Sequence, residues 1–167
     1  IGKQHLCENI DVTLGFMSDY VVVDEQQVYK LPEDMDMKKA ALTEPVSICL
    51  HGVDMCRIKP GDTVAVSGGG GIGNLTMQLA RLSGGTRVTL YDLMSRGGVL
   101  ELMALFKPEI TLEAIGQFSA MQKEATIIAG VFQSPYTMQR AVSLLDRLET
   151  ESLTSFVFEP DDYQKAF

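Results

Sequence analysis

The sequence lacks any apolar run close to the roughly 20 residues that a membrane-spanning helix needs. Its first residues, IGKQHLCENID, contain no apolar stretch behind a basic end, so they do not resemble a signal peptide. We therefore expect no membrane partner and, by default, a cytoplasmic location.

Basic residues and cysteines are also scarce. The 14 Lys and Arg residues against 22 Asp and Glu give a net charge of −8, which argues against a nucleic-acid partner, because phosphate binding needs clustered positive charge. The three cysteines, Cys7, Cys49 and Cys56, include no C-x-x-C pair and are odd in number, so no disulfide framework is expected. Cys49 and Cys56 are interpreted as core residues, since free cysteine is often buried.

What is present suits a globular chain. The 167 residues, 46% of them hydrophobic, suffice for one domain, or for one domain and part of another. Residues 19–23 and 28–31 are rich in Val and Tyr and predict two short strands. Asp36 predicts the N-cap of a helical stretch to Ala41, and Pro45 suits the first turn of a second helix.

The most informative segment ends at Asp92. TVAVS at residues 63–67 predicts a strand buried in a parallel sheet, and four glycines follow it. RVTLY at residues 87–91 predicts a second buried strand. The helix predicted between them carries apolar residues three and four positions apart: Ile72, Leu75, Leu79 and Leu82. The segment is a complete strand–turn–helix–strand unit.

The C-terminal part continues the alternation. Residues 97–106 and 125–132 predict strands, and residues 137–149 predict an amphipathic helix. Its apolar face holds Met138, Ala141, Val142 and Leu145. The whole pattern predicts an α/β fold with a doubly wound parallel sheet of Rossmann type.

The glycine turn is the first candidate binding site. Gly68, Gly70 and Gly73 form G-x-G-x-x-G after a strand and at the start of a helix, which is the context for dinucleotide binding. Gly68 allows the tight turn, Gly70 lets the backbone approach a pyrophosphate, and Gly73 lets the helix pack close to the strand. The helix N–H groups would face the phosphates. The predicted cofactor-binding residues of the turn are Gly68, Gly70, Gly71, Ile72 and Gly73.

Asp92 lies about 24 residues beyond Gly68, near the spacing of about 20 expected for the acid that binds the cofactor ribose. Its carboxylate can accept hydrogen bonds from both ribose hydroxyls and would repel a 2′-phosphate, so NAD is favoured over NADP. Two alternatives stay open on these residues alone. The glycines could form only a flexible loop, or the unit could belong to an S-adenosylmethionine methyltransferase.

The flanking segments carry a family resemblance. In chain order they are GFMSDYVVV, AALTEPVSICLHGV, VAVSGGGGIGNLTMQLAR with a Q-x-A-[KR] pattern at Gln78, Ala80 and Arg81, RGGVLELMALF, KEATIIAGVFQSPYTMQRAVSLL and DYQKAF. With these segments the chain resembles the zinc-dependent medium-chain dehydrogenase/reductase family, in particular its sorbitol, threonine and butanediol dehydrogenases. A methyltransferase would not explain the flanks.

The resemblance implies a Rossmann domain joined to a GroES-like, β-rich catalytic domain. It also implies zinc-assisted hydride transfer between a secondary alcohol or polyol and NAD. Glu44 of the T-E-P stretch would lie beside the catalytic zinc or bind it, and Cys7 would be the last ligand of a structural zinc loop. The simpler interpretations are that Glu44 caps the following helix and that Cys7 is an inert thiol. His51 is interpreted as a packing residue.

The chain departs from the family by lacking the zinc-binding cysteine, the His-Glu pair and three cysteines of the structural loop. With two histidines in all, it cannot build a complete catalytic site. Only Leu93 to Gly97 connect two strands that should run parallel, whereas a parallel crossover needs a dozen or more residues. We infer that roughly two strand–helix units are absent near residues 93–97. Either the complete molecule contains them or the deletion is real, and unpaired strand edges favour the former.

The expected domains are a GroES-like remnant at residues 1–45, an NAD-binding Rossmann domain at 46–155 and a return to the catalytic domain at 156–167. The predicted function is that of a zinc- and NAD-dependent alcohol or polyol dehydrogenase. The alternatives are a zinc-free reductase of the same superfamily and a non-catalytic nucleotide-binding fragment. The resemblance also implies a homo-oligomer, a dimer or a tetramer, while the particular alcohol or polyol stays open.

Overall fold

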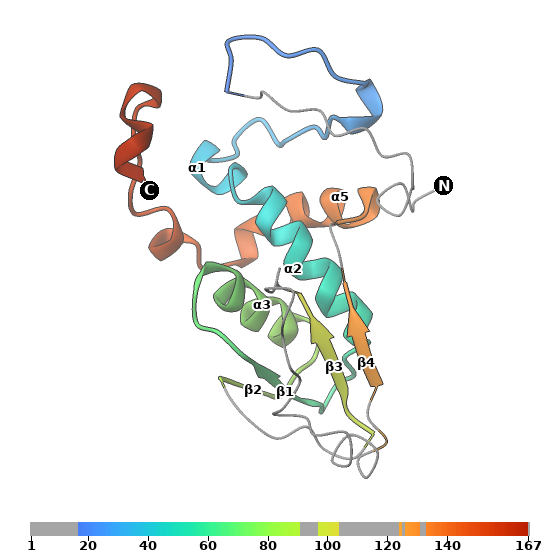
Figure 1. The fold of residues 1–167 in the computed structure, drawn as a ribbon. Coiled ribbons are helices and arrows are strands. Elements are labelled where there is room, and N and C mark those ends of the chain that lie inside the picture. The colour runs from blue at the N-terminus through green and yellow to red at the C-terminus, as the bar shows by residue number, and fades with distance from the viewer. Residues whose placement is uncertain (1–16, 91–96, 104–123, 125, 131–132, 167) are drawn as a thin grey trace.

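The computed structural model describes residues 17–90, 97–103, 124, 126–130 and 133–166 (Figure 1). Its elements, in chain order, are η2 (Glu25–Gln27), α1 (Met37–Ala40), α2 (Thr43–Cys56), β1 (Thr63–Val66), α3 (Gly71–Leu82), β2 (Arg87–Leu90), β3 (Val99–Leu102), β4 (Thr126–Ala129), α5 (Pro135–Leu144), η4 (Leu145–Arg147), η5 (Glu151–Leu153) and η6 (Pro160–Ala166).

The hydrophobic core lies between helices. Helix α2 packs against α3, α5 and β3, so it occupies the centre of the molecule (Figure 1). The apolar periodicity predicted this packing in part: Leu75 and Leu79 of α3 are buried, but Ile72 and Leu82 are 45% and 40% exposed. The buried apolar residues of this core are Val46, Cys49, Leu50, Val53, Leu75, Leu79, Ala80, Ala141, Leu145 and Leu148.

The four described strands form two parallel pairs. β1 pairs with β2 from Thr63↔Arg87 to Val66↔Leu90, and β3 pairs with β4 from Val99↔Thr126 to Leu102↔Ala129. The predicted parallel strands are therefore confirmed, but the described residues form two separate two-stranded sheets. Only Val66 of β1 is buried. The expectation of a buried first strand is wrong, because a two-stranded sheet is too narrow to enclose its strands.

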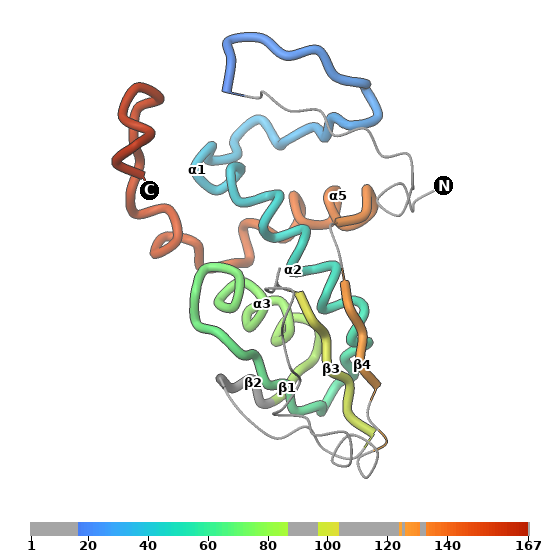
Figure 2. The backbone as a smooth tube through the Cα atoms, viewed as in Figure 1, coloured from blue at the N-terminus to red at the C-terminus, as the bar shows by residue number. Residues whose placement is uncertain are grey.

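Residues 17–36 form a loop instead of the two strands predicted at residues 19–23 and 28–31. This loop, blue in Figures 1 and 2, lies at the end of the molecule opposite the strands. Tyr20 and Val22 are more than nine-tenths exposed. The strand prediction was wrong because a β-strand needs a neighbouring strand for its backbone N–H and C=O groups, and the described part of the chain places none beside it.

Local helix signals were more reliable. The Asp36 side chain accepts a hydrogen bond from the Lys38 N–H at 2.9 Å, which confirms the predicted N-cap of α1. Pro45 lies in the first turn of α2, as expected, although the helix begins two residues earlier. The helix predicted at residues 137–149 is observed as α5 followed by η4.

The predicted break near residues 93–97 lies almost wholly outside the described residues. β2 ends at Leu90 and β3 begins at Val99, and these strands belong to different sheets, so they form no hairpin. The domain limits at residues 45 and 155 stay predictions. Over the ranges that the structure describes, no helix combines the length and apolar character needed to cross a membrane.

Candidate functional site

The glycine turn connects the end of β1 to the start of α3, as the sequence predicts. Gly68 has a φ of +102°, a backbone conformation that side-chain-bearing residues rarely adopt. Gly73 packs against the backbone of the turn. A Cβ atom at this position would lie 1.8 Å from the Gly68 carbonyl oxygen, which leaves no room for a side chain. Both glycines are thus required by the geometry of the turn itself.

The space in front of the turn is open. A Cβ atom on Gly68 or on Gly70 would meet no described atom within 4 Å. Gly70 is the N-cap residue of α3 and makes no side-chain hydrogen bond to the helix, so the first-turn N–H groups have no side-chain cap. Unpaired N–H groups and the positive end of the helix dipole favour an anion at this position.

Two side-chain hydrogen bonds hold the first turn of α3 on the side that faces α2. The Ile72 carbonyl oxygen accepts hydrogen bonds from the Thr76 hydroxyl at 2.8 Å and from the Cys49 thiol of α2 at 3.5 Å. Cys49 is fully buried, which confirms its interpretation as a core residue, and burial raises the pKa of its thiol. Cys56 is only half-buried. These contacts hold the start of α3 against α2.

Glu44 lies in the first turn of α2, where burial raises the pKa of its carboxyl. The N-cap position belongs to Leu42, so the interpretation of Glu44 as the helix cap is wrong. Burial is the main cause of the raised pKa of the Cys49 thiol, and the Glu44 charge adds to it only as the last of the causes.

The predicted metal ligands are not brought together by the described residues. Cys7 lies outside them, and within them no group of three His, Cys, Asp or Glu side chains could hold a metal ion. His51 is half-buried on α2. Asp92, the predicted ribose ligand, also lies outside the described residues. The candidate site therefore consists of the Gly68–Gly73 turn and the elements packed around it.

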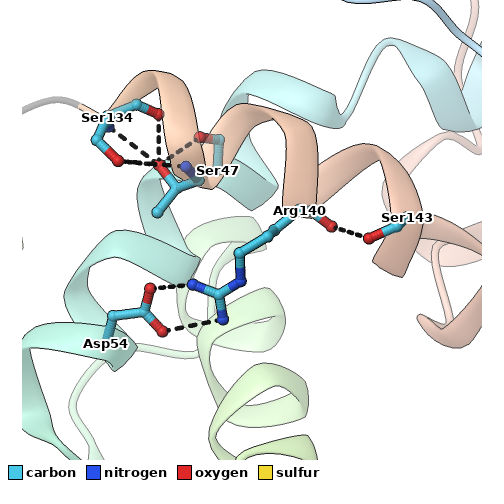
Figure 3. A network of polar contacts seen from close by, with 6 residues as sticks. Ser47, Asp54, Ser134, Arg140 and Ser143 are labelled. Atoms are coloured by element: carbon cyan, nitrogen blue, oxygen red, sulfur yellow. Dashed lines mark hydrogen bonds and ion pairs between the residues drawn. The ribbon is translucent and has the colours of Figure 1, made fainter. Parts of the chain in front are cut away.

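Sequence reasoning missed three long-range polar links between the helices and segments packed around this site. The Gln78 side chain of α3 hydrogen-bonds to the backbone of Glu149, 71 residues away. Arg140 of α5 forms a two-point ion pair with Asp54 of α2, and the Ser47 hydroxyl donates to the Thr137 hydroxyl at 3.1 Å (Figure 3). No local pattern signals such pairs, because each joins residues that are distant in the chain.

Comparison with known proteins gives relatives of one kind, although no protein-family model matches the chain. D-xylulose reductase A of Aspergillus oryzae is 34% identical over 118 residues, which are 64% of this chain and 32% of that protein. An uncharacterized zinc-type alcohol dehydrogenase-like protein of Escherichia coli is 30% identical over 101 residues, 57% of this chain and 29% of that protein. The matched part thus spans about a third of these relatives' length.

Solved structures support the fold. A Sinorhizobium meliloti protein named as a zinc-binding dehydrogenase, solved with bound NADP, is 25% identical to this chain with a TM-score of 0.76. The match covers 87% of this chain and 60% of that protein. The two parallel strand pairs and the helices packed on them are therefore described as an α/β fold of the Rossmann type.

Proposed function

We propose, because the chain belongs to the medium-chain dehydrogenase/reductase family, that it supplies the NAD(H)-binding part of an oxidoreductase of secondary alcohols or polyols. The observation that carries this proposal is the Gly68–Gly73 turn. It combines a left-handed glycine, open space at Gly70 and uncapped helix N–H groups between a parallel strand and a helix. Together these features fit a dinucleotide pyrophosphate.

Bound NAD would accept or donate the hydride, and the residues of this chain would bind and orient it. The N–H groups of α3 would hold the pyrophosphate while Gly70 leaves room for its approach. Asp92 would accept hydrogen bonds from the ribose hydroxyls and disfavour NADP. The S. meliloti relative was solved with NADP, so the cofactor preference needs a direct measurement with both dinucleotides.

Zinc does not fit the described residues in the same way. Glu44 is the one predicted ligand among them, and it has no two further ligand side chains near it in the described ranges. We therefore assign no step of the reaction to zinc. Zinc dependence, like activity on a polyol and assembly into an oligomer, is proposed for the complete enzyme, in which most of the ligands would come from other segments.

A pair of glycine variants tests the proposal. Gly70 has an ordinary φ of −72° and open space around a new Cβ, so Gly70→Ala should fold normally. We expect it to lose at least about tenfold in NADH affinity, or about 1.4 kcal/mol, because the methyl group occupies the approach of the pyrophosphate. Gly73→Ala should lose stability as well, because its Cβ would collide with the Gly68 carbonyl.

The measurements are NADH fluorescence titration and thermal unfolding, repeated with NADPH. Ser83→Ala is the matched control, since it changes an exposed side chain at the other end of α3. Full NADH affinity in a folded Gly70→Ala variant would show that the turn does not hold the pyrophosphate. A wild-type chain that binds neither NADH nor NADPH would refute the proposal. NADH binding without turnover would identify a nucleotide-binding part that needs further segments for catalysis.

A further inference from the structure

Residues 148–154, the segment that follows η4, lie along helix α3. Leu148 and Thr150 are 4% and 1% exposed, whereas Glu149 between them is exposed. Leu148 belongs to the same core cluster as Leu75 and Leu79 of α3. The alternation of buried and exposed residues docks one side of this segment on the helix and leaves the Glu149 side chain outside.

One side chain of α3 pairs with the backbone of this segment. The Glu149 N–H donates to Gln78 Oε1 at 2.8 Å, and Gln78 Nε2 donates to the Glu149 carbonyl oxygen at 3.0 Å. Gln78 Nε2 also donates to Asn74 Oδ1 at 2.8 Å, which orients the amide. Both backbone polar groups of Glu149 are thereby satisfied by one carboxamide. An alanine can replace neither bond, and a glutamate keeps the acceptor but has no donor.

The same segment reaches the glycine turn. The Thr150 carbonyl oxygen accepts hydrogen bonds from the N–H groups of Leu153 at 2.9 Å and Thr154 at 3.2 Å, which closes the η5 turn. This turn places Leu153 against the start of α3: a Cβ on Gly71 would lie 3.8 Å from Leu153 Cδ2. The segment therefore extends from Gln78, in the middle of α3, to the mouth of the turn.

We propose that Gln78 is a positioning residue that holds residues 149–154 as a wall beside the Gly68–Gly73 turn. In this arrangement the docking of the segment and the binding of a dinucleotide stabilise each other. The coupling rests on the proposed dinucleotide binding, and it is reciprocal. A change that loosens the docking of the segment lowers the affinity for the dinucleotide, and bound dinucleotide stabilises the docked segment by the same factor. Gln78 itself need not touch the ligand.

The test compares Gln78→Ala and Gln78→Glu with Gln139→Ala, a glutamine change on the exposed surface of α5. The two readouts are NADH titration and amide hydrogen exchange of Glu149, Leu153 and Thr154, with and without NADH. We expect NADH to slow this exchange in the wild type and in the Gln139→Ala control. Gln78→Ala should exchange faster at these amides and bind NADH about 5–10-fold more weakly, in the range of typical couplings between sites.

Gln78→Glu should fall between Gln78→Ala and the wild type, and it gives the same comparison if Gln78→Ala does not fold. Faster exchange with unchanged NADH affinity in either variant would overturn the coupling, because the segment would then be held without influence on the ligand. Unchanged exchange in Gln78→Ala would overturn the role of Gln78. Failure of the proposed function is a separate result, seen as absent NADH binding in the wild type.

Discussion

The helices and the strands of this molecule differ in how well they are enclosed. Between α2, α3 and α5, side chains such as Val46, Cys49 and Leu145 are fully buried. In the strands, Val66 of β1 is buried, while Val99 of β3 and Ile127 of β4 are 41% and 45% exposed. Parallel sheets are normally covered on both faces, so the usual order of burial is reversed here.

This difference indicates which part of the chain supports the site. The glycine turn begins at the end of the poorly enclosed strand β1. It ends at the start of α3, which is packed into the helical core. The sheet is split into two pairs, and the predicted absence of strand–helix units near residues 93–97 would account for its exposure. The stability of the described part should therefore depend mainly on the helices.

The largest effect on stability is expected from a substitution in the well-enclosed core between the helices. Leu79→Ala removes a side chain that is 1% exposed and should lower the free energy of unfolding by about 2–5 kcal/mol, since it leaves a cavity between α2 and α3. Val99→Ala, its counterpart in the sheet, should cost about 0.5–1 kcal/mol. Urea unfolding followed by far-UV circular dichroism measures both. Equal losses would mean that the strands are as well enclosed as the helices.

Sequence reasoning succeeded where the cause of a structure is local. The Asp36 cap, the glycine turn and the apolar spacing of α5 each depend on residues within a few positions of one another, and the spacing of α3 identified Leu75 and Leu79 but not the exposure of Ile72 and Leu82. It failed at residues 19–23 and 28–31, because a strand forms only when another strand lies beside it. It also missed the Gln78–Glu149 contact, since nothing in the local pattern of α3 indicates a partner 71 residues away.

An intermediate effect on stability is expected at the ion pair between α2 and α5. Arg140 contacts both carboxylate oxygens of Asp54 (Figure 3). It also lies 5.1 Å from the centre of the Tyr136 ring, and each side chain of the ion pair is about one-third exposed. Asp54→Asn should lower the free energy of unfolding by about 0.5–1 kcal/mol at low salt. The loss should shrink as salt is added, because salt screens the wild-type pair. A loss independent of salt would mean that packing, not charge, is responsible.

The smallest effect on stability is expected in the poorly enclosed strands, at Glu101 of β3. Both of its carboxylate oxygens are buried without a hydrogen-bond partner among the described residues. Burial raises the pKa of this carboxyl, and the nearby Gly130 N–H, which donates to the Leu102 carbonyl, only partly offsets the rise. Burial, followed by the Glu101 charge, raises the pKa of the Cys56 thiol to about 11. The fold therefore favours the protonated carboxyl.

Because the folded-state pKa of Glu101 lies above its ordinary value of 4.5, the stability linked to this group is complete below that value. It is lost as the pH rises through the folded-state pKa. Glu101→Gln keeps the shape of the side chain and removes this titration. Urea midpoints measured across that pH range should therefore fall less steeply with pH in the variant than in the wild type or in Glu25→Gln, an exposed control in η2. Identical slopes in all three proteins would show that Glu101 is solvated and that β3 is even less enclosed than its contacts indicate.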